Sequence, residues 1–103
     1  MSADHDPVTE IRTRLFTAPW PEAPRFAKNA PGLQEFLVAE VETRSGMVGV
    51  GYLQPLAGGL KTLECCIHEM LEPLLIGADP ADVEGLWDVM WDATYIQGRM
   101  GIT

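Results

Sequence analysis

The residue types that most often carry out catalysis are few in this sequence, and they form no recognisable catalytic group. His5 lies in a polar segment at the N-terminus, and His68 lies between Glu64 and Glu72 in a segment with helical periodicity. Acidic residues four positions before and after a histidine favour a solvated ion pair over a general base. Two histidines cannot build a histidine-based metal site, and no nucleophile stands near a base. We therefore predict neither catalytic residues nor metal ligands in this chain.

The two cysteines, Cys65 and Cys66, are neighbours in the same helical segment. Adjacent cysteines cannot join distant segments by a disulfide, and their spacing matches no zinc motif. We expect two reduced thiols packed on or beside a core.

The segment PLAGGLKTLE resembles a phosphate-binding loop in composition but not in spacing. Leu60 separates Gly59 from Lys61, and Pro55 removes a backbone donor from the loop. The phosphate motif requires glycine directly before lysine. A hinge or tight turn at the glycines is the default interpretation, and an anion at the following helix N-terminus stays open.

The last third of the chain carries an acidic row and an aromatic row, each with a spacing of four residues. The acidic row is Glu84, Asp88 and Asp92, and the aromatic row is Trp87, Trp91 and Tyr95. Rows of acidic residues are common on solvated helix faces, but a basic partner surface is the alternative. The aromatic row is typical of a core or a subunit contact more than of a ligand platform.

These residues must be positioned by a small α+β fold. Alternating apolar residues predict strands at 8–17, 36–43 and 47–52, with a proline-rich loop at 18–35 and a second loop at 51–61. Helical periodicity predicts helices at 60–77, ended or kinked by Pro73, and from Asp79 as N-cap onward. The expected architecture is a three-stranded antiparallel meander sheet followed by a helical layer. Residues 1–7 are expected to be a disordered tail.

The last helix has an apolar face too wide for one small sheet to cover. Its apolar residues span about 200° of the helix circumference, more than an ordinary surface helix presents. They are Val83, Leu86, Trp87, Val89, Met90, Trp91 and Ala93. We expect another copy of the chain, or another domain, to bury the remainder.

Composition excludes two classes of partner. Fifteen acidic residues against seven basic ones give a net charge of −8, whereas nucleic acids and anionic membranes require clustered Lys and Arg.

No apolar run approaches the ~20 residues of a membrane span. The polar start MSADHDP is unlike a signal peptide. We expect a cytoplasmic protein.

The order of motifs resembles the N-terminal capping domain of the mandelate racemase and muconate-lactonising branch of the enolase superfamily. The matching stretches are VAEVETRSGMVGVGYLQPLAGGLKTLE and LEPLLIGADPADVEGLWDVMWDATYIQGRMGI. The hairpin, the Leu-Leu-Ile-Gly helix end, the Asp-Pro-x-Asp-Val-Glu-x-Leu-Trp helix start and the terminal Gly-Arg-x-Gly occur in family order. The resemblance covers residues 8–103, which we therefore expect to be a capping domain.

This resemblance implies a chemistry that the composition does not indicate. Family members abstract a proton α to a carboxylate, and Mg²⁺ stabilises the enolate from which racemases, cycloisomerases and sugar-acid dehydratases proceed. The base and the metal ligands belong to a C-terminal (β/α) barrel, which we expect after residue 103. The implied partners are this barrel and an acid-sugar substrate, and we expect a homo-oligomer. The chain alone would bind no cofactor.

In the family, two loops of the capping domain close over the barrel and select the substrate. The candidate substrate-binding residues are Trp20, Arg25 and Lys28 in the first loop, and Tyr52 and Gln54 in the second. The basic pair would bind a carboxylate, and Tyr52 and Gln54 would bind hydroxyls. Alternatively, Tyr52 merely ends a strand and Trp20 fills the domain junction.

A second hypothesis belongs to a different class. A free-standing α+β module could use the Trp87–Trp91–Tyr95 face to dimerise or to bind another protein. Catalysis by the short chain itself is disfavoured, because no base and nucleophile pair is visible.

Overall fold

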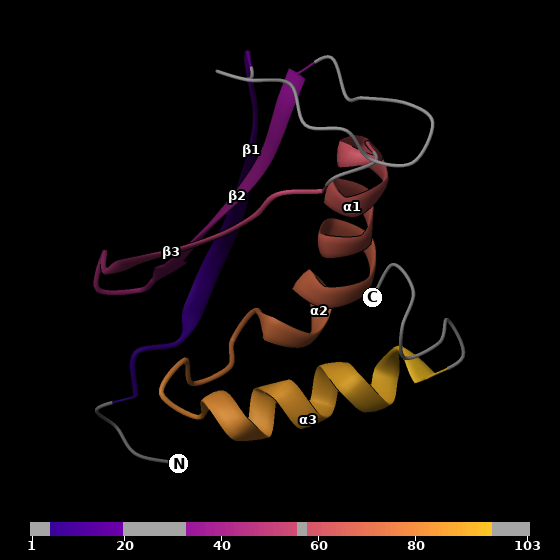
Figure 1. Ribbon diagram of the computed structural model, residues 1–103. Helices are drawn as coiled ribbons and strands as arrows, with labels where there is room; N and C mark the ends of the chain where they lie inside the picture. The colour runs from indigo at the N-terminus through magenta and orange to yellow at the C-terminus, as the bar shows by residue number, and fades with distance from the viewer. Residues whose placement is uncertain (1–4, 20–32, 56–57, 96–103) are drawn as a thin grey trace.

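The computed structural model describes residues 5–19, 33–55 and 58–95. Three strands precede four helical segments (Figure 1). These are β1 (Val8–Pro19), β2 (Leu33–Thr43), β3 (Val48–Leu53), α1 (Leu60–Cys66), the π-helical turn η1 (Ile67–Leu71), α2 (Glu72–Leu75) and α3 (Val83–Ala93). The strands form one antiparallel sheet in the order β1-β2-β3. The predicted meander sheet followed by helices is confirmed.

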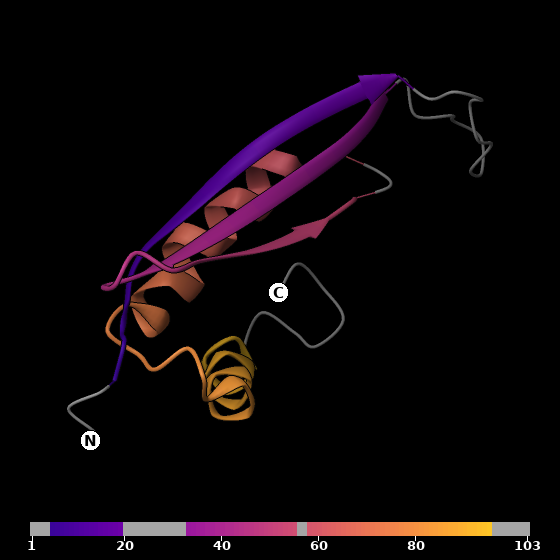
Figure 2. The same cartoon turned by 90° about the vertical axis from the view of Figure 1, so that its left-hand side faces the viewer.

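The sheet separates an apolar face from a charged one, as the alternation of residues predicts. On one face Leu37 is only 1% exposed, and α1 lies against this side of the sheet (Figure 2). On the other face Arg12 pairs with Glu40 and Glu42, at 3.7 and 3.2 Å. Arg14 also pairs with Glu40, at 2.7 Å. The helices therefore cover one face and leave the ion pairs on the other.

Both long strands extend further into the proline-rich segment than the sequence predicts. Pro19 pairs with Leu33 at the end of the β1–β2 ladder, and the Gln34 Nε2 group donates to the Pro19 carbonyl at 3.2 Å. Proline is tolerated there because β1 is an edge strand, so a ladder bond need not be lost. The expected loop boundaries at 18 and 35 are therefore too wide.

A tight turn joins β2 to β3, where the sequence predicts a short connection with glycine. The Gly46 N–H donates to the Thr43 carbonyl and the Thr43 N–H donates to the Met47 carbonyl, both at 2.9 Å. Gly46 has φ of 93°, a left-handed conformation that glycine adopts without a Cβ penalty. This is a three-residue hairpin loop with a glycine bulge.

The segment expected as the tail is partly anchored to this turn. The Asp6 carboxylate accepts hydrogen bonds from the Thr43 hydroxyl at 2.6 Å, and from the Ser45 N–H and hydroxyl at 2.9 and 2.6 Å. These bonds, the Ser45 hydroxyl first, lower the pKa of Asp6 below its usual 3.8. Residues 5–7 are thus fixed against the hairpin, and residues 1–4 lie outside the described residues.

Pro73 does not end the helical segment, which continues to Leu75. A π-helical turn, in which Glu72 N–H donates to the Ile67 carbonyl, comes directly before it. The helix then restarts with Pro73 in its first turn, where a missing N–H costs no helical bond. Gly77, with φ of 86°, follows the helix end as the sequence predicts.

The start of α3 differs from the sequence prediction. Asp82, not Asp79, is the N-cap, and its carboxylate accepts from the Gly85 N–H at 3.2 Å. Asp79 instead accepts from the Ala81 N–H at 3.0 Å, in a turn that also contains Pro80. Both aspartates have side chains suited to a cap, and the turn through Pro80 delays the helix by three residues.

The hydrophobic core is small. The buried apolar residues of the described part of the chain are Val8, Ile11, Leu37, Leu60 and Cys66. They come from β1, β2 and α1, whereas no residue of α3 is buried. Helix α3 lies away from the sheet, beside the end of α2 (Figures 1 and 2).

Candidate functional site

The bases of the two predicted substrate loops lie at the same end of the sheet. Pro19 pairs with Leu33 at the base of the first loop, and Leu37 pairs with Leu53 at the base of the second. Helix α1 also begins at this end (Figure 1). The meander topology alone explains this, since both connections leave from the end opposite the β2–β3 turn.

The structure places two of the five predicted substrate-binding residues. Tyr52 is 76% exposed near the end of β3, on the sheet face opposite Leu37, because it alternates with Leu53 in the ladder. Gln54 follows the strand and is half-buried. Trp20, Arg25 and Lys28 lie outside the described residues.

The second loop ends in a glycine turn that directs the chain into α1. Gly58 and Gly59 have φ of 84° and 90°, and the Leu63 N–H donates to the Gly59 carbonyl at 3.0 Å. Positive φ at two successive residues requires glycine in practice. These φ values explain why glycine occupies both positions. Helix α1, which follows them, has seven residues.

His68 connects the helical layer to the sheet. Its Nδ1 lies 3.3 Å from Glu72, as the predicted ion pair requires. Its Nε2 lies 2.7 Å from the Thr13 hydroxyl, which itself donates to the Glu64 carboxylate at 2.6 Å. Because the single hydrogen of the Thr13 hydroxyl is directed at Glu64, the Thr13 oxygen can only accept from His68. The contact with β1 was not predicted, since Thr13 is 55 residues away in the sequence.

We call these four side chains, Glu64, Thr13, His68 and Glu72, the helix–sheet network. Both ring nitrogens of His68 lie within hydrogen-bond distance of an oxygen, Nε2 of the Thr13 hydroxyl and Nδ1 of the Glu72 carboxylate. The side chains are partly buried, and His68 is 37% exposed. The network has the composition of a structural connection and contains no group free to act as a base.

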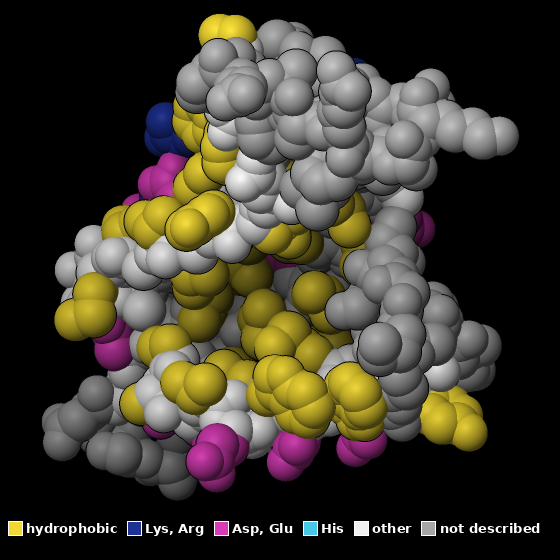
Figure 3. All heavy atoms as spheres, viewed as in Figure 1, with side chains coloured by type: hydrophobic (Ala, Val, Ile, Leu, Met, Phe, Trp, Pro, Cys, Tyr) yellow, Lys and Arg dark blue, Asp and Glu magenta, His cyan; other side chains and the backbone are white. Residues whose placement is uncertain are grey.

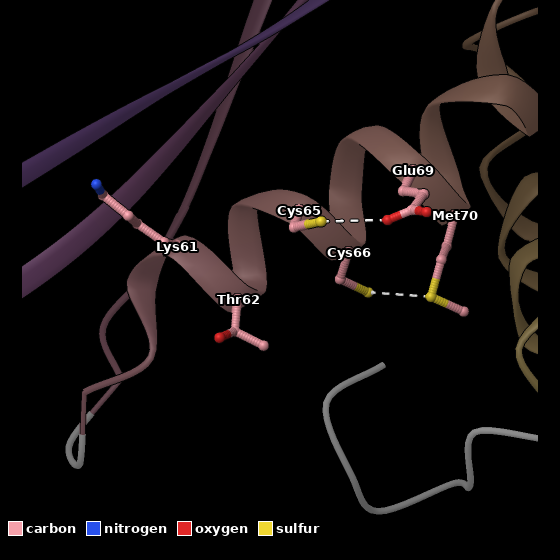
Figure 4. A pocket seen from close by; sticks show the side chains of 6 residues that line it. All are labelled: Lys61, Thr62, Cys65, Cys66, Glu69 and Met70. Carbon is pink, nitrogen blue, oxygen red and sulfur yellow. Dashed lines mark hydrogen bonds between the residues drawn. The ribbon is translucent and has the colours of Figure 1, made fainter.

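A hollow of about 420 Å³ lies on the side of α1 that carries the two thiols (Figure 4). The exposed Cys65 donates to Glu69 at 3.2 Å, and the buried Cys66 contacts the Met70 sulfur at 3.9 Å. The hydrogen bond to Glu69 and its negative charge raise the pKa of Cys65. Burial raises the pKa of Cys66. Raised thiol pKa values disfavour the nucleophilic thiolate.

Helix α3 carries an exposed apolar surface. Trp87 is 53% and Trp91 38% exposed, and their rings stack with centroids 4.8 Å apart. Hydrophobic side chains gather in a hollow between β3 and α3, with acidic side chains along the outer side of α3 (Figure 3). Glu84, Asp88 and Asp92 are exposed there. The expected wide apolar face is therefore present and is left uncovered by the sheet.

Within residues 5–19, 33–55 and 58–95, no three His, Cys, Asp or Glu side chains could hold a metal ion. The described residues therefore do not fit a Mg²⁺ site. Nor is any helix in this part of the chain long and apolar enough to cross a membrane.

A family model described as the N-terminal domain of mandelate racemase / muconate lactonizing enzyme matches residues 10–101. Arabinonate dehydratase of Saccharolobus solfataricus is 41% identical over 69 residues, covering 66% of this chain and 18% of that protein. D-galactonate dehydratase of Verminephrobacter eiseniae is 38% identical over 64 residues, covering 61% of this chain and 16% of that protein.

Among solved structures, a racemase of Streptomyces coelicolor with bound magnesium superposes with a TM-score of 0.83 at 26% identity. The alignment covers 92% of this chain and 27% of the racemase. The chain thus spans less than a third of the length of each of these relatives.

Proposed function

Because the chain belongs to the N-terminal domain family of mandelate racemase and muconate lactonizing enzyme, we propose that it is the substrate-specificity lid of a Mg²⁺-dependent enolase-superfamily enzyme. The reaction we infer is proton abstraction α to the carboxylate of a sugar acid, of the dehydratase or racemase type. The dehydratase names of two relatives support the sugar acid as substrate class. The chain is not catalytic on its own in this proposal.

One observation carries the proposal. Helix α3 has no buried residue, although its tryptophans and neighbouring aliphatic residues form an apolar face. Monomeric proteins rarely leave such a face in water unless it is an interaction site. A barrel domain seated against α3 would cover it, and the lid loops at the far end of the sheet would then lie over the barrel mouth.

The role of this chain would be to bind and enclose the substrate. Arg25 and Lys28 would pair with the carboxylate, and Tyr52 and Gln54 would bond the hydroxyls. Closure of the loops would exclude water and strengthen these interactions. In this proposal the proton-abstracting base and the magnesium ligands belong to the barrel.

The test is the reading frame beyond the Thr103 codon and the protein that it encodes. We expect an in-frame barrel with carboxylates at its strand ends, and dehydration or racemisation of an acid sugar that is lost when residues 8–103 are removed. The 103-residue chain alone, given Mg²⁺ and a panel of acid sugars, should show no turnover. A stop codon followed by unrelated sequence, or turnover by the short chain, contradicts the proposal.

The exposed tryptophans also support a second candidate, a free-standing α+β module that dimerises or binds another protein. Such a module would cover Trp87 and Trp91 in its own assembly, whereas a lid leaves them exposed until the barrel is present. The two candidates are separated by acrylamide quenching of the tryptophan emission, measured in a Trp20→Phe background at a series of rising protein concentrations. If quenching of Trp87 and Trp91 falls as protein concentration rises, the free-standing module is supported. If quenching is the same at all protein concentrations, the lid is supported.

We also propose a cytoplasmic location. Cys65 and Cys66 are both free thiols, which is the usual state of cysteines in the reducing cytosol.

A further inference from the structure

Strand β3 presents an unpaired edge. It is the last strand of the sheet, as Figure 2 shows, and its six residues are all exposed. Among the described residues, no backbone or side-chain group bonds to that edge. An exposed, apolar edge strand is a template for another strand.

The turn before β3 determines which backbone groups point outward. Thr43 and Met47 form a hydrogen-bonded pair, and such pairs alternate along an antiparallel ladder. Gly49 and Gly51 therefore bond to β2, opposite Val41 and Ala39. The N–H and C=O groups of the intervening residues point away from the sheet, and these residues are Val48, Val50 and Tyr52.

The other edge of the sheet is protected, and β3 is not. Near its start β1 has a register irregularity between Val8 and Glu10. The outward backbone of Val8 is bonded to Gly77 and Ala78 at 2.8 and 3.0 Å. Charged side chains follow along the strand. Bulges, charges and covering loops are the usual protections of an edge, and residues 48–53 have no charge and no proline.

Charge indicates which partner fits this edge. No charged residue occurs between Arg44 and Lys61, in a chain whose net charge is −8. Two copies would repel each other along the acidic side of α3, but not along β3. The acidic residues of β2 beside it, Glu40 and Glu42, are already paired with arginines of β1.

We propose that β3 pairs antiparallel with β3 of a second copy of this chain, about a two-fold axis through Val50. The residues whose backbone groups point away from the sheet are spaced symmetrically about Val50. The axis therefore pairs Val50 with Val50 of the other chain, and Val48 with Tyr52 of the other chain. Each of the three pairs would exchange two backbone hydrogen bonds. The apolar side chains would also stack in cross-strand pairs, because Val48, Val50 and Tyr52 are 42, 68 and 76% exposed on the same face.

The test is the oligomeric state of Val50→Lys, measured by sedimentation velocity across a broad concentration range. We expect the native chain to be a dimer and the variant to dissociate at least about tenfold more readily, because the axis places the two lysines directly opposite each other. Val83→Lys is the matched control. It adds the same charge on α3 at a valine of similar exposure, 70% against 68%, and should leave the dimer unchanged.

A charge-swap experiment shows whether loss of the dimer comes from charge repulsion or from misfolding. Val50→Lys and Val50→Glu should each be monomeric with native circular dichroism, and a mixture of the two should form a heterodimer.

Hydrogen exchange of the backbone amides reports the register of the two β3 strands. Val48, Val50 and Tyr52 should be protected only in the dimer, whereas Gly49 and Gly51 should be protected in both states.

The inference is overturned by a native chain that is monomeric, by a Val50→Lys chain that dimerises as tightly as the native chain, or by charge-swap variants that do not associate when mixed. The two proposals share Tyr52, which the lid proposal assigns to the substrate, but the Val50 variants test pairing through β3 without changing Tyr52 or α3. Loss of the dimer with unchanged tryptophan quenching would support pairing through β3.

Discussion

The helix–sheet network allows a quantitative prediction for Thr13→Val. The substitution keeps the shape of the side chain and its preference for a strand, and removes the hydroxyl that bonds His68 and Glu64 at 2.7 and 2.6 Å. Hydrogen bonds to charged groups contribute about 1.5–3 kcal/mol when well buried. Because His68 is 37% exposed and solvent weakens the loss, we expect a total of about 1–2 kcal/mol.

The assay is urea unfolding followed by circular dichroism, with Thr17→Val as the matched control. Thr17 lies on the same strand and is exposed, so its substitution should change the free energy of unfolding by less than about 0.5 kcal/mol. A double-mutant cycle with His68→Ala should give a coupling energy of about 1 kcal/mol. Equal stabilities of the Thr13 and Thr17 variants would refute the hydrogen-bonded connection between α1 and β1.

Three further predictions concern the helix cap, acid stability and thiol reactivity. Asp82→Ala should lower the free energy of unfolding by about 1 kcal/mol in urea titrations. The loss should be larger than for Asp79→Ala, because Asp82 is the N-cap of α3. A larger loss for Asp79→Ala would contradict this assignment. The lowered pKa of Asp6 should give a stability that is present above its unfolded pKa and lost as pH falls through the folded value, so Asp6→Asn should flatten the acid side of a thermal stability profile. Cys66, whose pKa burial raises, should react with a thiol reagent at neutral pH more slowly than a short cysteine peptide; an equal or faster rate would show that it is not buried.

Local patterns were sufficient to predict the elements of this fold. The alternation of apolar and polar residues predicted all three strands, and Gly46 predicted the hairpin turn. Both signals depend on neighbouring residues only. The helix start was wrong by three residues because two aspartates with equal capping ability compete. Only the turn that Pro80 forms in three dimensions decides between them.

Contacts between distant segments could not be predicted in the same way. Glu64 and Glu72 indicated an ion pair for His68, but nothing in the sequence indicated Thr13 as its second partner. The anchoring of Asp6 by Thr43 and Ser45, residues 37 and 39 positions away, was missed for the same reason. Such contacts depend on strand register, which a single sequence specifies only through the pattern of the whole sheet.

The breadth of the apolar face on α3 was predicted from helical periodicity alone, and its exposure follows from the arrangement of the layers. The sheet has one apolar face, and α1 already occupies it (Figure 2). Among the elements that the structure describes, a second helix can then bury its own apolar residues only against α1 or α2, and α3 meets the end of α2 with no residue buried. A core of five buried apolar residues in the described part of the chain gives a small domain little stability to spare, so a surface that removes Trp87 and Trp91 from water would stabilise the fold. If the chain is the lid that we propose, Trp87→Ala should therefore destabilise the barrel-containing protein more than the 103-residue chain. An equal effect on both would contradict a barrel contact through α3.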